Sequence, residues 1–209
     1  MNQVILIIPA FNEEKNIKTV VDNLIRNYPD LDYVVVNDGS TDSTERILRD
    51  GGYNHITLPV NLGLAGCFQT GMKYAWEKGY SCAVQFDGDG QHRAEYVAEM
   101  KAKMDEGYSI VIGSRFVNHK KNYSLRMVGS RLIGLAIWLT TGARVSDPTS
   151  GMRMFDREMI EKFAYRMNYG PEPDTISLLI RQGAKVAEVP VVIDERKGGE
   201  SYLKPGVAV

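Results

Sequence analysis

The sequence predicts an α/β fold, in which one domain has a mostly parallel central sheet flanked by helices. Three observations lead to this prediction. Short apolar, β-branched runs alternate with amphipathic stretches of helical length through residues 1–115, as in a parallel sheet with helical crossovers. The 209 residues are enough for one well-buried domain. Neither an internal repeat nor a low-complexity linker divides the chain.

The first half of the chain alternates predicted strands and helices. The strands are the apolar runs at residues 4–8, 33–36, 56–58, 83–86 and 109–113. The first helix is predicted to be capped by Asn12 and ended by Pro29, with acidic residues at its start. The following helices are predicted to run to Arg49, from the segment 61–66 through Trp76, and over residues 93–106.

The alternation breaks after Arg115. Residues 126–141 mix basic and strongly apolar side chains, as an amphipathic helix would. Such a helix either packs on the core or lies at a membrane interface, and the pattern alone leaves both open. The remaining predicted elements are a strand over 152–155, helices over 157–166 and 173–182, and a last strand over 186–193.

Composition argues against several classes of function. The 25 basic and 26 acidic residues nearly balance, which disfavours a nucleic-acid partner bound over a broad basic surface. Cys67 and Cys82 lack metal-type spacing and lie in apolar segments, so we expect reduced core thiols and a cytoplasmic protein. The first apolar run has no basic leader and is typical of a strand, and no segment has the ~20 apolar residues that span a bilayer.

Asp87 and Asp89 stand where a predicted buried strand ends. In open α/β sheets, ligands bind beyond the carboxyl ends of the strands. Side chains at i and i+2 of an extended segment face the same way, so both carboxylates can reach one cation, and Gly88 and Gly90 let the backbone turn. A polar turn is the alternative for the motif taken alone. Its position favours a Mg²⁺ or Mn²⁺ site.

Two more polar loops follow predicted strands, at residues 9–14 and 37–42. Because parallel strands end at the same edge of a sheet, the three loops should converge. Asp38 could accept hydrogen bonds from a base or a ribose, or serve only as a turn or capping residue. The chain has no Walker Gly-x4-Gly-Lys-Ser/Thr motif and no strand-linked Gly-x-Gly-x-x-Gly motif. A nucleotide diphosphate bound with a metal fits the loops better.

Six ordered motifs resemble the family 2 glycosyltransferases, and most closely the branch of dolichyl- and polyprenyl-phosphate sugar transferases and polysaccharide-assembly enzymes. The motifs are residues 7–14, 36–42, 61–63, 87–92, 113–116 and 147–153. The resemblance implies the GT-A fold and metal-dependent, inverting transfer of a sugar from a UDP- or GDP-sugar. It also implies a nucleotide-sugar-binding half at residues 1–115 and an acceptor-binding half at 116–209. The implied acceptor is a lipid phosphate or a glycan of cell-envelope or polysaccharide synthesis.

The resemblance assigns roles on the donor side. Asp87 and Asp89 become the metal-binding DXD motif, with Gln91 as an added ligand and Asp89 as a catalytic group. Asp38 is expected to meet the base. The family usually has two aspartates in this loop, and Asn37 replaces the first here, which leaves the base preference open. The other expected donor contacts are Pro9, Ala10, Asn12, Glu13, Gly63, Gly88 and Arg196, the last in a terminal loop that closes over the donor.

The acceptor side is assigned in the same way. The residues expected near the phosphates are Arg115, Arg126, Arg131 and Ser150, and Arg115 is also expected to act in catalysis. An acceptor hydroxyl needs a general base, whereas a phosphate acceptor is already anionic. The candidate bases are Glu172, Asp174 and Asp147, of which the resemblance favours the Glu172 region. Asp147 can also be a simple turn residue, and His92 is expected to support the metal motif or lie at the surface.

Two other functions compete with a glycosyltransferase. A sugar nucleotidyltransferase would have a Gly-rich basic loop for a triphosphate near the N-terminus, whereas residues 9–14 are acidic. A non-catalytic sugar-nucleotide-binding partner of a membrane glycan assembly would not need the Asp87/Asp89 pair. We therefore expect an enzyme, cytoplasmic and peripheral at the inner face of the cell membrane.

Overall fold

Seven strands form one sheet at the centre of the structure, a computed structural model that describes residues 3–116 and 125–193. The order across the sheet is β3-β2-β1-β4-β6-β5-β7. The strands are β1 (Val4–Ala10), β2 (Asp32–Asn37), β3 (His55–Thr57), β4 (Cys82–Gln85), β5 (Ile110–Ser114), β6 (Arg153–Asp156) and β7 (Val186–Pro190). This sheet confirms the predicted α/β fold class.

The sheet is parallel except at β6, which pairs antiparallel with both β4 and β5. The strands β1, β2, β4 and β5 therefore end at the edge where β6 begins. Loops that are far apart in the sequence meet at this edge, which we call the carboxyl edge.

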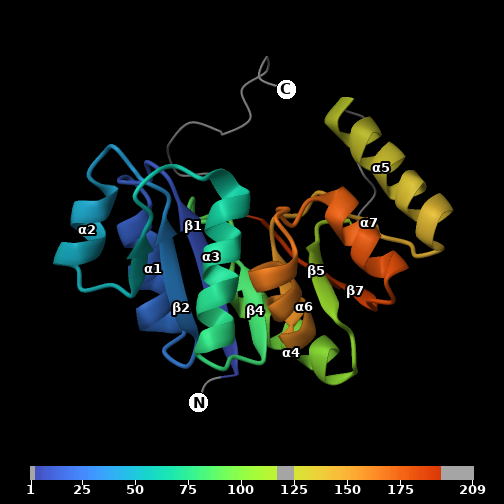
Figure 1. The fold of residues 1–209 in the computed structure, drawn as a ribbon, viewed down its shortest axis with the longest axis horizontal. Helices are drawn as coiled ribbons and strands as arrows, with labels where there is room; N and C mark the ends of the chain where they lie inside the picture. Colours follow the sequence, from blue (N-terminus) through green and yellow to red (C-terminus); the bar gives the residue numbers. More distant parts are fainter. Residues whose placement is uncertain (1–2, 117–124, 194–209) are drawn as a thin grey trace.

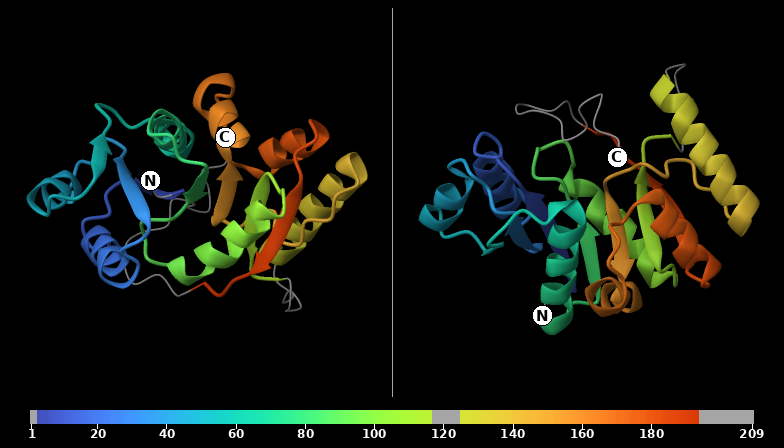
Figure 2. Two further views of the ribbon diagram at one scale, coloured as in Figure 1. Left: turned by 90° about the horizontal axis from the view of Figure 1, so that it is seen from below. Right: turned by 45° about the horizontal axis from the view of Figure 1, so that its top comes forward.

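Helices cover both faces of the sheet (Figures 1 and 2). One face carries α1 (Ile17–Asn27), α2 (Thr44–Asp50) and α4 (Val97–Asp105), and the other carries α3 (Gly63–Glu77), α6 (Arg157–Glu161) and α7 (Pro173–Arg181). Along β1, Leu6 and Ile8 belong to the first core and Ile5 and Ile7 to the second. All four are fully buried, as expected for a strand covered on both faces.

The predicted cap of the first helix is wrong. The helix α1 begins at Ile17 instead of directly after Asn12. Asn12 has a φ of 56°, in the left-handed region that asparagine tolerates better than most residues. Its side-chain oxygen accepts a hydrogen bond from the Thr41 N–H at 2.9 Å, so Asn12 joins the loops after β1 and β2.

Other element boundaries differ in detail. The strand β1 continues through Pro9 to Ala10, and β7 ends at Pro190, before the predicted residue 193. The predicted helix 157–166 is α6 followed by a π-helical turn over Lys162–Arg166. The predicted helix 93–106 is a 3₁₀ turn over Ala94–Tyr96 followed by α4.

The helix α5 (Leu125–Thr141) lies beside α7 at the outer side of the molecule (Figures 1 and 2). Ile137 is 3% exposed and packs into the core, while Leu132 and Leu139 are 62% and 70% exposed. The helix is therefore attached along one side and presents apolar side chains on another. Within the described residues, no helix is both long and apolar enough to cross a membrane.

Candidate active site

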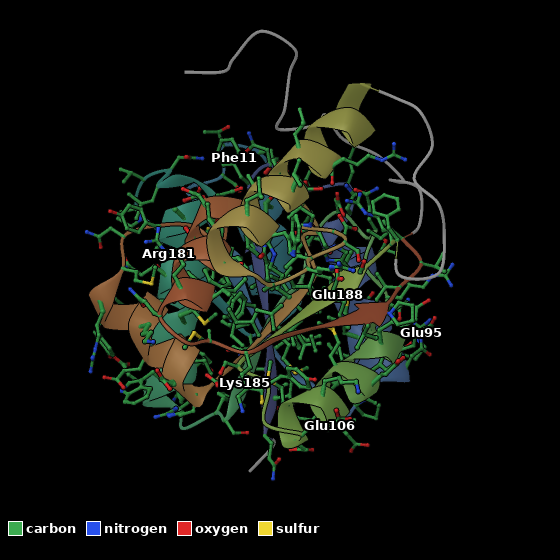
Figure 3. The ribbon with its side chains drawn as sticks, turned by 90° about the vertical axis from the view of Figure 1, so that its right-hand side faces the viewer. Phe11, Glu95, Glu106, Arg181, Lys185 and Glu188 are labelled. Atoms are coloured by element: carbon green, nitrogen blue, oxygen red, sulfur yellow. The ribbon has the colours of Figure 1, made fainter. Side chains whose placement is uncertain are left out.

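Three polar loops meet at the carboxyl edge, as the sequence predicts. They follow β1, β2 and β4, which are adjacent and parallel. The loop before β6 reaches the same edge because β6 is antiparallel, and Arg115 reaches it because it follows β5. Figure 3 shows Phe11, after β1, at this upper end of the sheet, with Lys185 and Glu106 at the opposite end.

The loop after β4 holds the Asp87 carboxylate in place. The Asp87 N–H donates to Nδ1 of His92 at 2.9 Å, so the hydrogen of the neutral ring lies on Nε2. That nitrogen is 3.5 Å from Oδ2 of Asp87. The His92 side chain is buried, whereas that of Asp87 is 37% exposed. The Asp87 carboxylate of the predicted metal motif is thus held by the buried His92 side chain and remains partly accessible to solvent.

The second carboxylate of the motif is held by its own loop. The Gln91 N–H donates to Oδ1 of Asp89 at 3.0 Å, which closes the turn at Gly90. No cluster of three or more histidine, cysteine or acidic side chains within residues 3–116 and 125–193 could hold a metal. A pair of carboxylates nevertheless suits Mg²⁺ or Mn²⁺, because substrate phosphates and water usually complete their coordination.

Two glycines let neighbouring loops approach the metal motif. A Cβ added at Gly88 would come within 3.0 Å of the Pro9 carbonyl oxygen, and one at Gly151 would come within 2.8 Å of Oδ2 of Asp87. Only glycine fits such contacts without movement. The end of β1 and the loop before β6 are therefore packed directly on the motif.

The loop after β2 is tied to the rest of the site by Asp38. This residue is 2% exposed, and its Oδ1 accepts a hydrogen bond from the Leu62 N–H at 2.7 Å. Its own N–H donates to the Ala10 carbonyl at 2.8 Å. Asp38 thus orders the turn that precedes α3 at Gly63, whose φ is 72°. Contact between Asp38 and a base stays a prediction.

Asn37 also has a structural role. Its amide donates to Oε2 of Glu45 at 2.9 Å, and its Oδ1 accepts from the Ser40 N–H at 3.3 Å. An aspartate at this position would place a second carboxylate against Glu45. The Asn37 amide therefore satisfies the Glu45 carboxylate, so the presence of asparagine does not indicate which nucleotide base the site binds.

Glu13 lies in the first loop with its side chain turned inward. It is 7% exposed, its Oε2 accepts from the Asn16 amide at 2.7 Å, and its N–H donates to the Thr44 hydroxyl at 2.9 Å. The Glu13 contacts hold the first loop against α2. A donor contact by Glu13 or by the neighbouring residues Pro9 and Ala10 stays a prediction.

Arg115 and Asp147 form a two-pronged ion pair. Nε and Nη2 of Arg115 lie 2.7 and 2.8 Å from the two carboxylate oxygens, and the Arg115 N–H also donates to Asp147. Asp147 is fully buried. Burial alone would raise the pKa of Asp147, but the bonds from Arg115 outweigh it and lower that pKa. A carboxylate held in this way is a poor proton acceptor.

The loop before β6 has two further anchors. Glu188 on β7 accepts hydrogen bonds from the N–H groups of Ser146 and Asp147, at 2.8 and 2.9 Å. The Ser150 hydroxyl donates to the Gly113 carbonyl at 2.5 Å. Ser150 is 1% exposed, and its hydroxyl is used by the protein backbone. A contact of Ser150 with a phosphate stays a prediction. Glu188 was not predicted, because its pairing joins residues more than 40 positions apart.

Arg153, on β6, is a buried cation that the sequence did not single out. It is 4% exposed, and its Nη2 donates to the Pro148 carbonyl at 2.7 Å. Burial lowers the pKa of Arg153 to about 10, while attraction to Glu172, Asp147 and Asp87 opposes that shift. The guanidinium is therefore charged near neutral pH and is attracted by acidic groups of the site.

The other predicted residues are placed as follows. Glu172 is the exposed N-cap residue of α7, and Asp174 is exposed in the first turn of that helix. Arg131 lies on the exposed side of α5. The side chain of Arg126 and the whole of Arg196 lie outside the described residues.

Comparison with known proteins decides the family. Residues 5–164 match the family described as glycosyl transferase family 2. The chain belongs to glycosyltransferase family 2. This family 2 chain is an enzyme that transfers sugar from a nucleotide-sugar, as predicted.

Named relatives have related activities. The polyprenol monophosphomannose synthase of Mycolicibacterium smegmatis is 30% identical, over 95% of this chain and 80% of that protein. The UDP-N-acetylglucosamine–dolichyl-phosphate N-acetylglucosaminyltransferase of Methanococcus voltae is 31% identical, over 89% of this chain and 83% of that protein.

A solved structure shares the fold of this family 2 chain. Glucosyl-3-phosphoglycerate synthase from Mycobacterium tuberculosis, solved with Mn²⁺, UDP and phosphoglyceric acid, has a TM-score of 0.70 at 20% identity. The match covers 95% of this chain and 72% of that one. It confirms the predicted GT-A type of α/β domain.

Proposed function

We propose that this family 2 glycosyltransferase moves a sugar from a UDP- or GDP-sugar to a polyprenyl-type lipid phosphate, with Mg²⁺ or Mn²⁺ bound at Asp87 and Asp89. The observation that carries the proposal is the Asp87 carboxylate, fixed by buried His92 and open at the edge where the other loops meet. The names of the relatives support the lipid-phosphate acceptor, and the Mn²⁺ and UDP of the structural neighbour support the donor side.

The donor side of the site has the chemistry that this transfer needs. Asp87 and Asp89 would hold the cation, with Gln91 as the third predicted ligand, and the bound cation would supply Lewis-acid stabilisation of the leaving diphosphate. The His92 Nε2 and the Gln91 N–H keep the Asp87 and Asp89 carboxylates from turning away. Such fixed ligands need little reorganisation as charge develops in the transition state.

The acceptor side offers cations next to an apolar surface. Arg115 remains 32% exposed after pairing with Asp147, and α5 presents Leu132, Leu135 and Leu139 to solvent. An anionic headgroup could bind Arg115, with Arg126 and Arg131 as further predicted contacts, while α5 contacts the lipid chain or the membrane surface. We therefore expect peripheral membrane contact at this side.

A lipid-phosphate acceptor also removes the need for a strong base. Asp147 is already bound to Arg115, which leaves Glu172 and Asp174 as the acidic candidates. Of these, Glu172 is the one that attracts Arg153 electrostatically. We assign Glu172 to the acceptor side without a role as general base, because an already anionic phosphate has no proton that must be removed.

An acceptor panel tests the proposal. The purified protein is given UDP- and GDP-hexoses with Mn²⁺ and one of three acceptors: undecaprenyl phosphate in detergent, the dephosphorylated polyprenol, or a soluble oligosaccharide. We expect sugar transfer to the polyprenyl phosphate and none to the polyprenol. Transfer to the oligosaccharide alone would contradict the lipid-phosphate acceptor. Nucleotide binding without turnover for every acceptor would indicate a non-catalytic partner.

A further inference from the structure

Arg153 lies inside the sheet directly below the metal motif. It is the first residue of β6 and pairs with Gln85 of β4, two residues before Asp87. Side chains two apart on a strand share a face, so Arg153 and Gln85 lie on the same side of the sheet as Phe155 and Ala83, the side that carries α3 and α7. Glu172 is the N-cap of α7, on that same side.

The guanidinium of Arg153 is only partly bound by the fold. Among the described residues, its Nε has no hydrogen-bond partner, and neither has Oε1 of Gln85. Arg157, at the other end of β6, contrasts with it. Arg157 donates to the carbonyls of Ala75, Trp76 and Tyr80, and its guanidinium lies 3.7 Å from the ring centre of Trp76. A buried polar group left unpaired in this way often belongs to a functional site.

Three acidic residues from three separate loops interact electrostatically with Arg153. Asp87 follows β4, Asp147 lies before β6 and Glu172 precedes α7. All three attract the guanidinium, which is buried where charge interactions are strong.

We propose that Arg153 is a positioning residue of the transfer reaction, which holds Asp87 on the metal side and Glu172 on the acceptor side in a fixed relation. This inference rests on the proposed function and adds a residue to it. It explains why a full positive charge is buried beneath the site, where, among the described residues, the guanidinium donates to the neutral Pro148 carbonyl and its Nε has no partner.

The test compares Arg153→Met and Arg153→Lys with the matched control Arg157→Met. Arg153→Met removes the charge and keeps a side chain of similar length. Arg153→Lys keeps the charge but loses the planar guanidinium, which can donate two parallel hydrogen bonds. Three quantities are measured for each: Tm, the Kd for the nucleoside diphosphate with Mn²⁺ by calorimetry, and kcat for transfer to undecaprenyl phosphate.

We expect kcat of Arg153→Met to fall about 100-fold, the usual effect of a misplaced reacting group. The Kd should change less than about threefold, because His92 still holds the Asp87 carboxylate when Arg153 is replaced. Arg153→Lys should recover about tenfold of that loss. Arg157→Met should lower Tm and leave kcat within about threefold of wild type, because in the described part of the chain Arg157 contacts backbone carbonyls and the Trp76 ring at the opposite end of β6 from the site.

Wild-type transfer with an unchanged kcat in folded Arg153→Met overturns this inference and leaves the proposed function standing. Absence of transfer by the wild type overturns both. If Arg153→Met does not fold, Arg153→Lys decides: a tenfold loss of kcat with unchanged Kd supports the inference, and wild-type kcat overturns it.

Discussion

His92 contacts Asp87 through both ring nitrogens. Nδ1 accepts the backbone N–H, and Nε2 faces the carboxylate oxygen. The imidazole also packs edge-on against Phe86, with ring centres 5.6 Å apart, so the ring has little freedom to turn. Replacing a residue that orients a metal ligand without touching the metal typically costs about 10- to 100-fold in metal affinity.

Replacing His92 should therefore weaken metal binding with the fold intact. We expect His92→Leu to raise the Kd for Mn²⁺ by about 10- to 100-fold, because it removes both contacts with Asp87. His92→Asn is the matched variant, since its amide oxygen can replace Nδ1 as the acceptor of the Asp87 N–H, and it should lose less. Calorimetry with Mn²⁺ and UDP measures both. Equal Mn²⁺ affinity in His92→Leu and wild type would show that the contacts are incidental.

At the scale of the elements, the end of β2 is joined to α2 and β3 through Glu45. The carboxylate accepts hydrogen bonds from Asn37, Thr57 and Arg49. Burial raises the pKa of Glu45, but these bonds outweigh it and bring the pKa to about 2. Glu45 thus contributes stability that is fully present above pH 4.5 and is lost as the pH falls toward 2.

This arrangement predicts the effect of restoring the aspartate that the family usually has at position 37. Asn37→Asp removes the donor to Glu45 and places two carboxylates together in a buried site, so it should cost about 1–3 kcal/mol of unfolding free energy at pH 7. Adding Glu45→Gln should recover most of that cost, because glutamine can donate to the new carboxylate. The double-mutant cycle is measured by urea unfolding at pH 7. If the unfolding free-energy costs of Asn37→Asp and Glu45→Gln simply add in the double mutant, the proposed contact between the two side chains is contradicted.

At the scale of the whole molecule, the strand-and-loop plan could be predicted from local sequence. Apolar runs that end in polar residues identified the strands, and the rule that parallel strands end together brought Asp38 and Asp87 to one edge. The residues that hold the site could not be found in this way. Asp147 pairs with Arg115 across 32 positions, and Arg153 lies opposite Gln85, two residues before Asp87, because β6 inserts between β4 and β5. The hydrophobic periodicity of the sequence reveals neither the Arg115–Asp147 ion pair nor the position of β6 between β4 and β5.

The predicted donor and acceptor halves, residues 1–115 and 116–209, are less separate than the sequence suggests. The strand β6, from the second half, lies next to β4, and Gly151 contacts the metal motif of the first half. The site is therefore built from both parts of the chain. Assignment of donor and acceptor contacts to each half stays a prediction.

The central claim is that Asp87 and Asp89 hold the cation required for sugar transfer. The most direct measurement is the Mn²⁺ dependence of nucleoside diphosphate release from UDP- and GDP-sugars with undecaprenyl phosphate, compared between wild type, Asp89→Asn and the exposed control Asp50→Asn. We predict that chelation with EDTA abolishes wild-type release, that Asp50→Asn behaves as wild type, and that Asp89→Asn loses at least about 100-fold in kcat/KM, or about 2.7 kcal/mol. Wild-type rates in folded Asp89→Asn, or transfer that persists in EDTA, would contradict the account.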